Sequence, residues 1–254
     1  MKKLLAITAL SAALFFGQTA AAEEKAAEEV KPSHVEMVLV LDESGSMSDL
    51  TRDTIGGFNS MIEKEKKLDV DAHVTTVLFN DQYKMLYNRR ELKDVSKMTD
   101  KDYTPGGMTA LLDAVGRTIH KMDMVSGIHR KDKGNKVLFV IITDGEENDS
   151  REYTYADVKK LIKDRQENAG WEFIFLGANI DAAAAAENLG IDRDRAVKYK
   201  NTGSGVRANF KAVAELSDSL AKSGRVSDEW KETVEKDEDD AADKQSAAVT
   251  SHRR

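Results

Sequence analysis

Short apolar runs alternate with longer stretches of helical periodicity along most of this chain. The strand-like segments are 37–41, 74–79, 83–87, 137–142, 173–176 and 196–199. Between them, hydrophobic residues recur at helical spacing, as in Leu111, Val115, Ile119 and Met122. The continuous apolar character of 37–41 and 137–142 is typical of strands that are buried on both faces. About 190 residues, from Val35 to Gly224, are enough for one domain with a sizeable core.

Alternating strands and helices of this length predict a doubly wound, mainly parallel α/β sheet with right-handed crossovers. One connection differs, because only Asn80, Asp81 and Gln82 separate the second and third strand segments. That spacing favours a hairpin and one antiparallel edge strand. In folds of this class, ligands gather at the carboxyl ends of the strands, where the strand order reverses.

Helix starts are also visible in the sequence. Thr154 is followed three residues later by Asp157, which predicts a capping box, and Asp181 is expected to cap an alanine-rich helix. Asp49 or Thr51 is expected to cap the first helix of the domain.

Oxygen-bearing side chains follow two of the expected strands. Asp42, Ser44 and Ser46 form a D-x-S-x-S sequence after the first strand, and Asp144 follows the most apolar strand in Thr-Asp-Gly. Thr109 ends the sequence Pro-Gly-Gly-Met-Thr at the start of a helix. These are hard ligands, and with no cysteine in the chain and no histidine nearby they favour Mg²⁺, Mn²⁺ or Ca²⁺ over zinc or copper. Water and an external anionic ligand would complete the coordination of such an ion.

These five residues resemble the metal-ion-dependent adhesion motif of the von Willebrand factor A (vWA) family, and the resemblance covers residues 35–224. It is strongest to a bacterial and phage branch, through T-I-G-G-F-N at 54–59, T-A-L-L-D-A at 109–114 and F-L-G-A-N-I-D at 175–181. The resemblance implies a six-stranded, mainly parallel, Rossmann-like sheet with helices on both faces.

The resemblance also implies roles for the motif residues. Ser44, Ser46 and Thr109 would bind the cation through their hydroxyls, while Asp42 and Asp144 would bind it directly or hold coordinated waters. An Asp or Glu of a partner protein would supply the last ligand. Met108 departs from the family pattern, in which a small hydroxyl residue commonly precedes the threonine, but it is not a ligand position.

Two other functions stay open beside that of a binding module. One is a Mg²⁺-dependent phosphoryl-transfer enzyme, and the other is an envelope scaffold with a purely structural metal site. Aspartate-based phosphatases need a second acid two residues after the nucleophile, and Ser44 occupies that position here. No adjacent base is available to activate Ser44 or Ser46. We therefore expect a binding module and no enzyme.

The ends of the chain differ in composition from the domain. Lys2 and Lys3, an apolar run at 4–16 and Ala20-Ala21-Ala22 predict that residues 1–22 are a signal peptide. The apolar run is shorter than the roughly 20 residues of a membrane-spanning helix. Residues 23–34 are expected to be a charged linker, and residues 225–254 an acidic, disordered tail with a short helix around Trp230. The protein is thus predicted to be periplasmic or secreted, with no membrane span after signal removal.

Charge excludes one class of partner. The net charge is −7, and removal of residues 1–22 deletes two lysines and no acid, which gives −9. Nucleic-acid binding requires clusters of Lys and Arg, so it is not expected. The oligomeric state is not indicated by the sequence.

Three other features receive a structural interpretation. The G-x-G-x-x-A sequence at 203–208 follows the last strand and is expected to form a turn into a helix. Glu146, Glu147 and Asp149 are expected to form a solvated acidic loop. The histidines lack the mutual spacing of metal ligands and are expected at the surface or the core edge; they are His34, His73, His120, His129 and His252.

Overall fold

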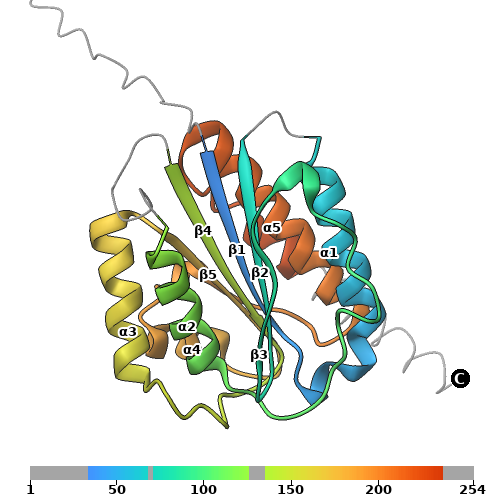
Figure 1. Cartoon of the computed structure of the whole chain (residues 1–254), viewed down its shortest axis with the longest axis vertical. Coiled ribbons are helices and arrows are strands. Elements are labelled where there is room, and N and C mark those ends of the chain that lie inside the picture. Colours follow the sequence, from blue (N-terminus) through green and yellow to red (C-terminus); the bar gives the residue numbers. More distant parts are fainter. Residues whose placement is uncertain (1–33, 68–70, 126–134, 237–254) are drawn as a thin grey trace, which may run out of the picture.

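The computed structural model describes residues 34–67, 71–125 and 135–236, and a six-stranded sheet lies at its centre (Figure 1). The spatial order is β3-β2-β1-β4-β5-β6, and every neighbouring pair is parallel except β2 and β3. The strands are β1 (His34–Asp42), β2 (Ala72–Phe79), β3 (Tyr83–Glu91), β4 (Asn135–Thr143), β5 (Glu172–Gly177) and β6 (Ala196–Lys198). The predicted fold class, including the antiparallel edge strand, is confirmed.

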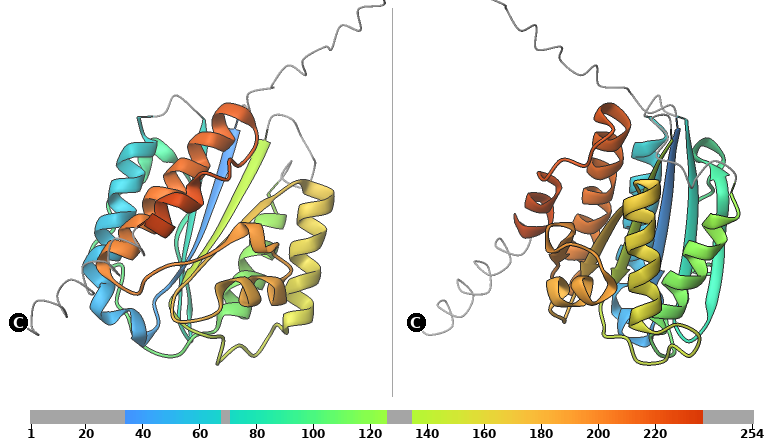
Figure 2. Two further views of the ribbon diagram at one scale, coloured as in Figure 1. Left: turned by 180° about the vertical axis from the view of Figure 1, so that it is seen from behind. Right: turned by 90° about the vertical axis from the view of Figure 1, so that its left-hand side faces the viewer.

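Helices cover both faces of the sheet (Figures 1 and 2). One face carries α1 (Thr51–Glu65) and α5 (Gly203–Ser223); the other carries α2 (Leu111–Asp123), α3 (Tyr155–Asp164) and α4 (Ala182–Leu189). Short helical turns occur at Gly45–Leu50, Leu92–Asp94, Arg165–Ala169 and Arg193–Arg195.

Two hydrophobic cores result, one on each side of the sheet. Alternate residues of β1 enter different cores, because successive side chains of a strand point to opposite faces. Leu39 packs with α1 and α5, whereas Val38 and Val40 pack with α2, α3 and α4. This explains why the strand sequence is apolar without alternation.

The strand order reverses between β1 and β4. From β1 the chain builds outward through β2 to β3, then returns to β4 on the other side of β1 and continues outward to β6. Leu41 of β1 pairs with Ile142 of β4, so the two strands end side by side. The loops that follow them therefore meet at the topological switch point, where ligands bind in folds of this class.

A long connection between β3 and α2 crosses the carboxyl edge of the sheet. Val95, Met98 and Tyr103 are buried in the core beneath α1, and Leu111 then begins α2 in the opposite core. The side chain of Asn59 holds this connection to α1, because it accepts from the N–H of Met98 at 2.8 Å and donates to its carbonyl at 2.9 Å. The segment 105–109 is thereby carried over the ends of the strands.

The folded unit is longer at both ends than the sequence indicates. His34, expected in the linker, is the first residue of β1. Past the expected boundary at Gly224, residues 230–236 are helical, and Val226, Trp230 and Val234 are buried in the core under α1 and α5. The signal peptide, the rest of the linker and residues 237–254 lie outside the described residues. In the described part of the chain, no helix is long and apolar enough to cross a membrane.

Candidate metal centre

Asp42 joins the ends of β1 and β4. It is the last residue of β1 and is only 1% exposed. Its Oδ1 accepts a hydrogen bond from the N–H of Ser44 at 2.7 Å, and its Oδ2 accepts one from the Thr143 hydroxyl at 2.6 Å. The carboxylate is therefore fixed by the turn that follows β1 and by the last residue of β4.

A chain of hydroxyls leads from this loop to the second aspartate. The hydroxyls of Ser44 and Ser46 lie 3.0 Å apart, and Ser46 donates to Oδ1 of Asp144 at 2.6 Å. Asn201, which follows β6, donates to Oδ2 of Asp144 at 3.4 Å. The structure thus places Asp42, Ser44, Ser46 and Asp144 in one group at the switch point.

Thr109 neighbours this group from the long connection. Its hydroxyl lies 3.9 Å from the position that a Cβ on Gly145 would occupy, which is one residue after Asp144. Asn148 holds Thr109 in place, accepting from its N–H at 2.8 Å and donating from its own N–H to the Thr109 carbonyl at 3.0 Å.

Gly107 allows the long connection to pack closely against the loop after β1. It has a left-handed φ of 75°, and a Cβ at this position would collide with the Asp81 carboxylate. Its carbonyl accepts from the N–H of Gly45 at 3.2 Å, while Gly106 donates to the Glu43 carbonyl at 2.9 Å. A glycine is required at 107 because other residues rarely adopt this conformation.

The centre concentrates negative charge without a cationic partner. Asp42 and Asp144 are both buried, and in the described part of the chain no Lys, Arg or His forms an ion pair with either. Burial raises the pKa of Asp42, as does the nearby Asp144, and hydrogen bonds from Ser44 and Thr143 oppose the rise. Since a buried charge is costly unless it is paired, a cation bound between the two carboxylates would stabilise both.

One side of the group faces solvent. Asp42, Ser44, Thr109 and Asp144 are each no more than 4% exposed. Ser46 is exposed, and the neighbouring Met108 is an apolar side chain that is 51% exposed. A ligand would therefore approach past Ser46 and Met108.

The acidic loop after Asp144 is only partly solvated. Glu146 is exposed, but Glu147 turns inward and accepts hydrogen bonds from the N–H groups of Leu112, Asp149 and Ser150 at 2.7–3.0 Å. Glu147 thus holds the loop against the start of α2, where a carboxylate also complements the helix dipole.

Sequence reasoning missed several residues that support the centre. Thr143 bonds to Asp42, Asn201 and Asn179 bond to Asp144, and Tyr103 donates to the Asp42 carbonyl at 2.6 Å. Thr143, Asn179 and Asn201 lie at or just after strand ends, so the rule that found Asp42 and Asp144 could also have found them. Tyr103 gave no such signal.

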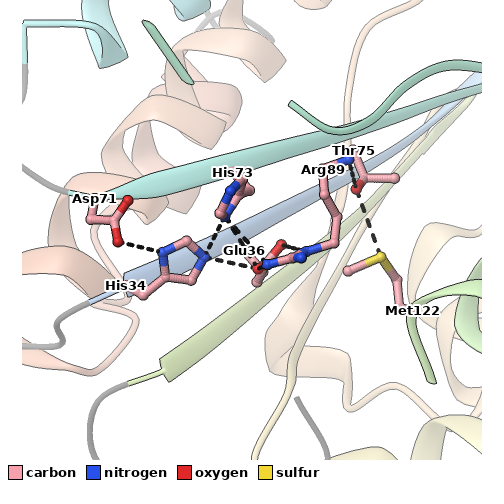
Figure 3. A network of polar contacts seen from close by, with 7 residues as sticks. All are labelled: His34, Glu36, Asp71, His73, Thr75, Arg89 and Met122. Carbon is pink, nitrogen blue, oxygen red and sulfur yellow. Dashed lines mark hydrogen bonds and ion pairs between the residues drawn. The ribbon is translucent and has the colours of Figure 1, made fainter. Parts of the chain in front are cut away.

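His34 and His73 are partly buried, as expected for core-edge residues, but they also form a cluster that their spacing in the sequence did not predict. His34 and His73 meet beside Glu36 at the opposite edge of the sheet (Figure 3). They are 39 residues apart, on two strands whose pairing local spacing does not reveal. His120 contacts the Tyr153 hydroxyl, and His129 and His252 lie outside the described residues.

A doubly wound sheet with an oxygen-rich group at its switch point defines the class of vWA-type domains. The family model "vWA found in TerF C terminus" matches residues 34–191, which is more than half of the chain. The protein therefore belongs to this vWA family. A comparison with curated proteins finds no match.

Solved structures share the fold at low sequence identity. A von Willebrand factor type A protein from Catenulispora acidiphila is 16% identical, with a TM-score of 0.50, and the match covers 73% of this chain and 43% of that one. The D319A mutant of the PilB minor pilin from Streptococcus sanguinis is 13% identical, with a TM-score of 0.52 and coverage of 74% and 62%. The vWF domain of the type V pili tip protein Mfa5 from Porphyromonas gingivalis is 13% identical, with a TM-score of 0.50 and coverage of 78% and 99%. At such identities the likeness shows the fold alone, and this chain spans less than half the length of the first of these proteins.

Proposed function

We propose that the five residues of the adhesion motif bind a divalent cation; they are Asp42, Ser44, Ser46, Thr109 and Asp144. The observation that carries this proposal is the pair of buried carboxylates, Asp42 and Asp144, with no ion-pair partner in the described residues. Carboxylates and hydroxyls are the ligands of hard cations, so Mg²⁺ is the expected ion and Mn²⁺ or Ca²⁺ are alternatives.

The cation would serve to bind a protein partner. Two carboxylates and three hydroxyls leave a coordination position for an external ligand, and the exposed side at Ser46 and Met108 gives access to it. An Asp or Glu of the partner would enter this position and bond to the metal. Met108 would supply an apolar contact beside it.

We also propose that this recognition takes place outside the cytoplasm. The proposal depends on residues 1–22, whose basic start, apolar run and small residues fit a signal peptide. The intact mass of the protein from an envelope fraction tests it, since a mature chain should begin at or near Glu23.

The alternatives have less support in the geometry. A phosphoryl-transfer enzyme would need an activated nucleophile, yet in the described structure the hydroxyls of Ser44 and Ser46 contact each other and Asp144, and no His or Lys. A structural metal site in a scaffold would bind the same cation, and it differs from a binding module only in that a partner would not depend on the metal.

The melting temperature of the metal-stripped protein tests the cation site. A ligand that binds only the native state adds roughly 2.7 kcal/mol at a hundredfold excess over Kd. For a domain of this size, that corresponds to a rise of roughly 5–10 °C on addition of Mg²⁺. Asp144→Ala should abolish the rise, whereas Glu146→Ala, an exposed acid in the same loop, should keep it. Identical wild-type melting curves in Mg²⁺ and in EDTA would refute the site.

A further inference from the structure

Two histidines and a glutamate converge at the amino-terminal edge of the sheet, opposite the candidate metal centre (Figure 3). Glu36 of β1 pairs in register with His73 of β2, and His34 lies two residues before Glu36 on the same face of β1. Nε2 of His34 is 2.8 Å from Oε1 of Glu36 and 2.9 Å from Nδ1 of His73. The third side of the triangle, from His73 Nδ1 to Glu36 Oε1, is 3.5 Å.

We propose that His34 Nε2, Glu36 Oε1 and His73 Nδ1 form a second metal site, which takes a divalent transition-metal ion such as Zn²⁺. Ligands at about 2.0–2.1 Å from a tetrahedral zinc ion lie roughly 3.3 Å from one another. The observed separations of 2.8–3.5 Å bracket that value. Two imidazoles with one carboxylate suit Zn²⁺ and other divalent transition-metal ions, whereas Mg²⁺ and Ca²⁺ prefer oxygen ligands alone.

Hydrogen-bond partners orient both rings as metal ligands. Nδ1 of His34 faces the Asp71 carboxylate at 3.1 Å, which can only accept, so this nitrogen carries a hydrogen. Nε2 faces Oε1 of Glu36 at 2.8 Å, and a metal ion bound there would displace the hydrogen on Nε2. Nδ1 of His73 faces Nη2 of Arg89 at 3.4 Å, which can only donate, so Nδ1 presents its lone pair. A carboxylate behind a histidine ligand is a recurrent support in metal sites.

Arg89 is the group that competes with a metal for Glu36. Its Nε lies 3.0 and 3.1 Å from the two carboxylate oxygens, and its Nη2 also contacts Oε1. The arginine comes from the edge strand β3, has a left-handed φ of 46°, and has a side chain that is 32% exposed. It can keep its bond to Oε2 while the metal takes Oε1, so it should weaken metal binding without preventing it.

The cluster is enclosed on one side and open on the other. Thr75 closes it toward α2, because its hydroxyl donates to Met122 at 3.7 Å and accepts from the N–H of Arg89 at 3.1 Å. Glu36 is 3% exposed, but His73 is 23% exposed, which leaves a path for the ion and for water as a fourth ligand. Three protein ligands with water in the fourth position is a coordination that many protein zinc sites have.

Calorimetric titration of Zn²⁺ into the untagged, metal-stripped full chain tests the proposal. The titration uses an Asp144→Ala background, which disables the candidate centre at the other edge. In this background we expect one Zn²⁺ site at the histidine cluster, and His73→Ala should weaken its affinity about tenfold or more. His120→Ala is the matched control, since this exposed histidine lies on α2, outside the cluster, and contacts Tyr153. Co²⁺ in place of Zn²⁺ should give visible bands of a nitrogen-bound ion that His73→Ala removes and His120→Ala keeps.

Two further variants test the same site without removing a ligand, in case His73→Ala does not fold. Asp71 is 71% exposed, so Asp71→Asn should fold normally and weaken Zn²⁺ binding about tenfold through His34. Arg89→Gln removes the competing cation and should tighten binding about tenfold or more. Unchanged Zn²⁺ affinity and stoichiometry in these variants would overturn the proposal.

Discussion

Glu65 is an acid in the apolar core between α1 and α5. It is fully buried, its Oε2 accepts a hydrogen bond from the Ser217 hydroxyl at 2.5 Å, and its Oε1 has no partner. Burial raises the pKa of Glu65 to about 7, from an ordinary value of 4.5. Ser217 and Lys64 lower the pKa and Asp218 raises it, but desolvation dominates. The group is therefore protonated in the native state at pH values where the unfolded chain has lost the proton.

This difference predicts that the free energy of unfolding falls as the pH rises from 4.5 to about 7. In that window the native state binds more protons than the unfolded state, so each rise in pH favours unfolding. A shift of this size corresponds to a loss of up to roughly 3 kcal/mol by pH 8. Glu65→Gln should remove this part of the pH dependence and be more stable than wild type at pH 8, as measured by urea unfolding.

Glu63→Gln is the matched control for this prediction. Glu63 is exposed on the same helix, so its neutralisation should leave the pH profile of stability nearly unchanged. If Glu65→Gln and wild type kept the same slope of stability between pH 4.5 and 7, Glu65 would be ionised in the native state and the prediction would fail.

The two clusters, one at each end of β1, differ in how well they can be predicted from the positions of single residues. Asp42 and Asp144 each follow an apolar strand directly, and such positions converge when the strands are parallel neighbours. His34 and His73 meet only because β1 and β2 pair in one register, with Glu36 opposite His73. Local spacing does not specify that register, so their meeting could not be predicted from the sequence alone.

At the scale of elements, all six strands were predicted in place, and five of them were predicted too short. β1 begins at His34 and β4 at Asn135, earlier than the apolar runs at 37–41 and 137–142. Polar residues occupy these strand ends, so hydrophobicity alone does not reveal them. Pairing extends the strands because backbone hydrogen bonds do not depend on side-chain polarity.

Helix caps were predicted correctly where a side chain caps the first turn of the helix. Thr154 and Asp157 form the predicted capping box, and the side chain of Asp181 accepts from the N–H of Ala184. The prediction for the first helix was wrong, because α1 begins at Thr51 after Leu50, without a side-chain cap. The turn at Gly45–Leu50 leads directly into α1 and makes a separate cap unnecessary.

Neighbouring glycines in α1 should respond in opposite ways to a methyl group. A Cβ on Gly57 would lie 2.5 Å from Cδ2 of Phe210, which is buried where α5 packs on α1. Because Phe210 has little room to move, Gly57→Ala should destabilise the fold by about 1–3 kcal/mol. Gly56 is exposed with nothing near its Cβ position, so Gly56→Ala should stabilise by about 0.5–1 kcal/mol through helix propensity.

Urea unfolding of both variants beside wild type measures this difference. Equal effects of the two substitutions would mean that α1 and α5 are not in close contact at Gly57. A stabilising effect of Gly57→Ala would contradict the packing directly.

At the scale of the whole molecule, the pattern of strands and helices predicted the class of fold but not the strand order. The six strands and their mainly parallel pairing were expected from the resemblance to the vWA family. The reversal between β1 and β4 was not predicted, since alternation alone allows several strand orders. The short helix expected around Trp230 is present at 230–236, but its burial against the core was not predicted, because Val226, Trp230 and Val234 are separated by charged residues. Trp230 and Val234 lie four residues apart on one face of this helix, and Val226 precedes the helix; all three are buried in the core.

β1 connects the two candidate sites of the molecule. It carries His34 and Glu36 at one end and Asp42 at the other, roughly 26 Å apart for eight residue steps of an extended strand. Zn²⁺ and Mg²⁺ would thus bind at opposite ends of β1. Partner binding at the Asp42 edge should therefore depend on Mg²⁺ and not on the histidines.

The last prediction concerns capture of a partner from an envelope extract on the immobilised protein. Asp144→Ala should abolish Mg²⁺-dependent capture, because it removes one of the two buried carboxylates that would hold the cation. Thr109→Ala should weaken capture more mildly, since it deletes one neutral ligand and leaves both carboxylates. Glu146→Ala, exposed in the same loop, and His73→Ala, at the other edge, should capture as wild type does. Circular dichroism checks that each variant is folded. If wild type and folded Asp144→Ala retained a partner equally, in Mg²⁺ and in EDTA alike, adhesion through the metal would be excluded, and a structural role for the cation would account for the site.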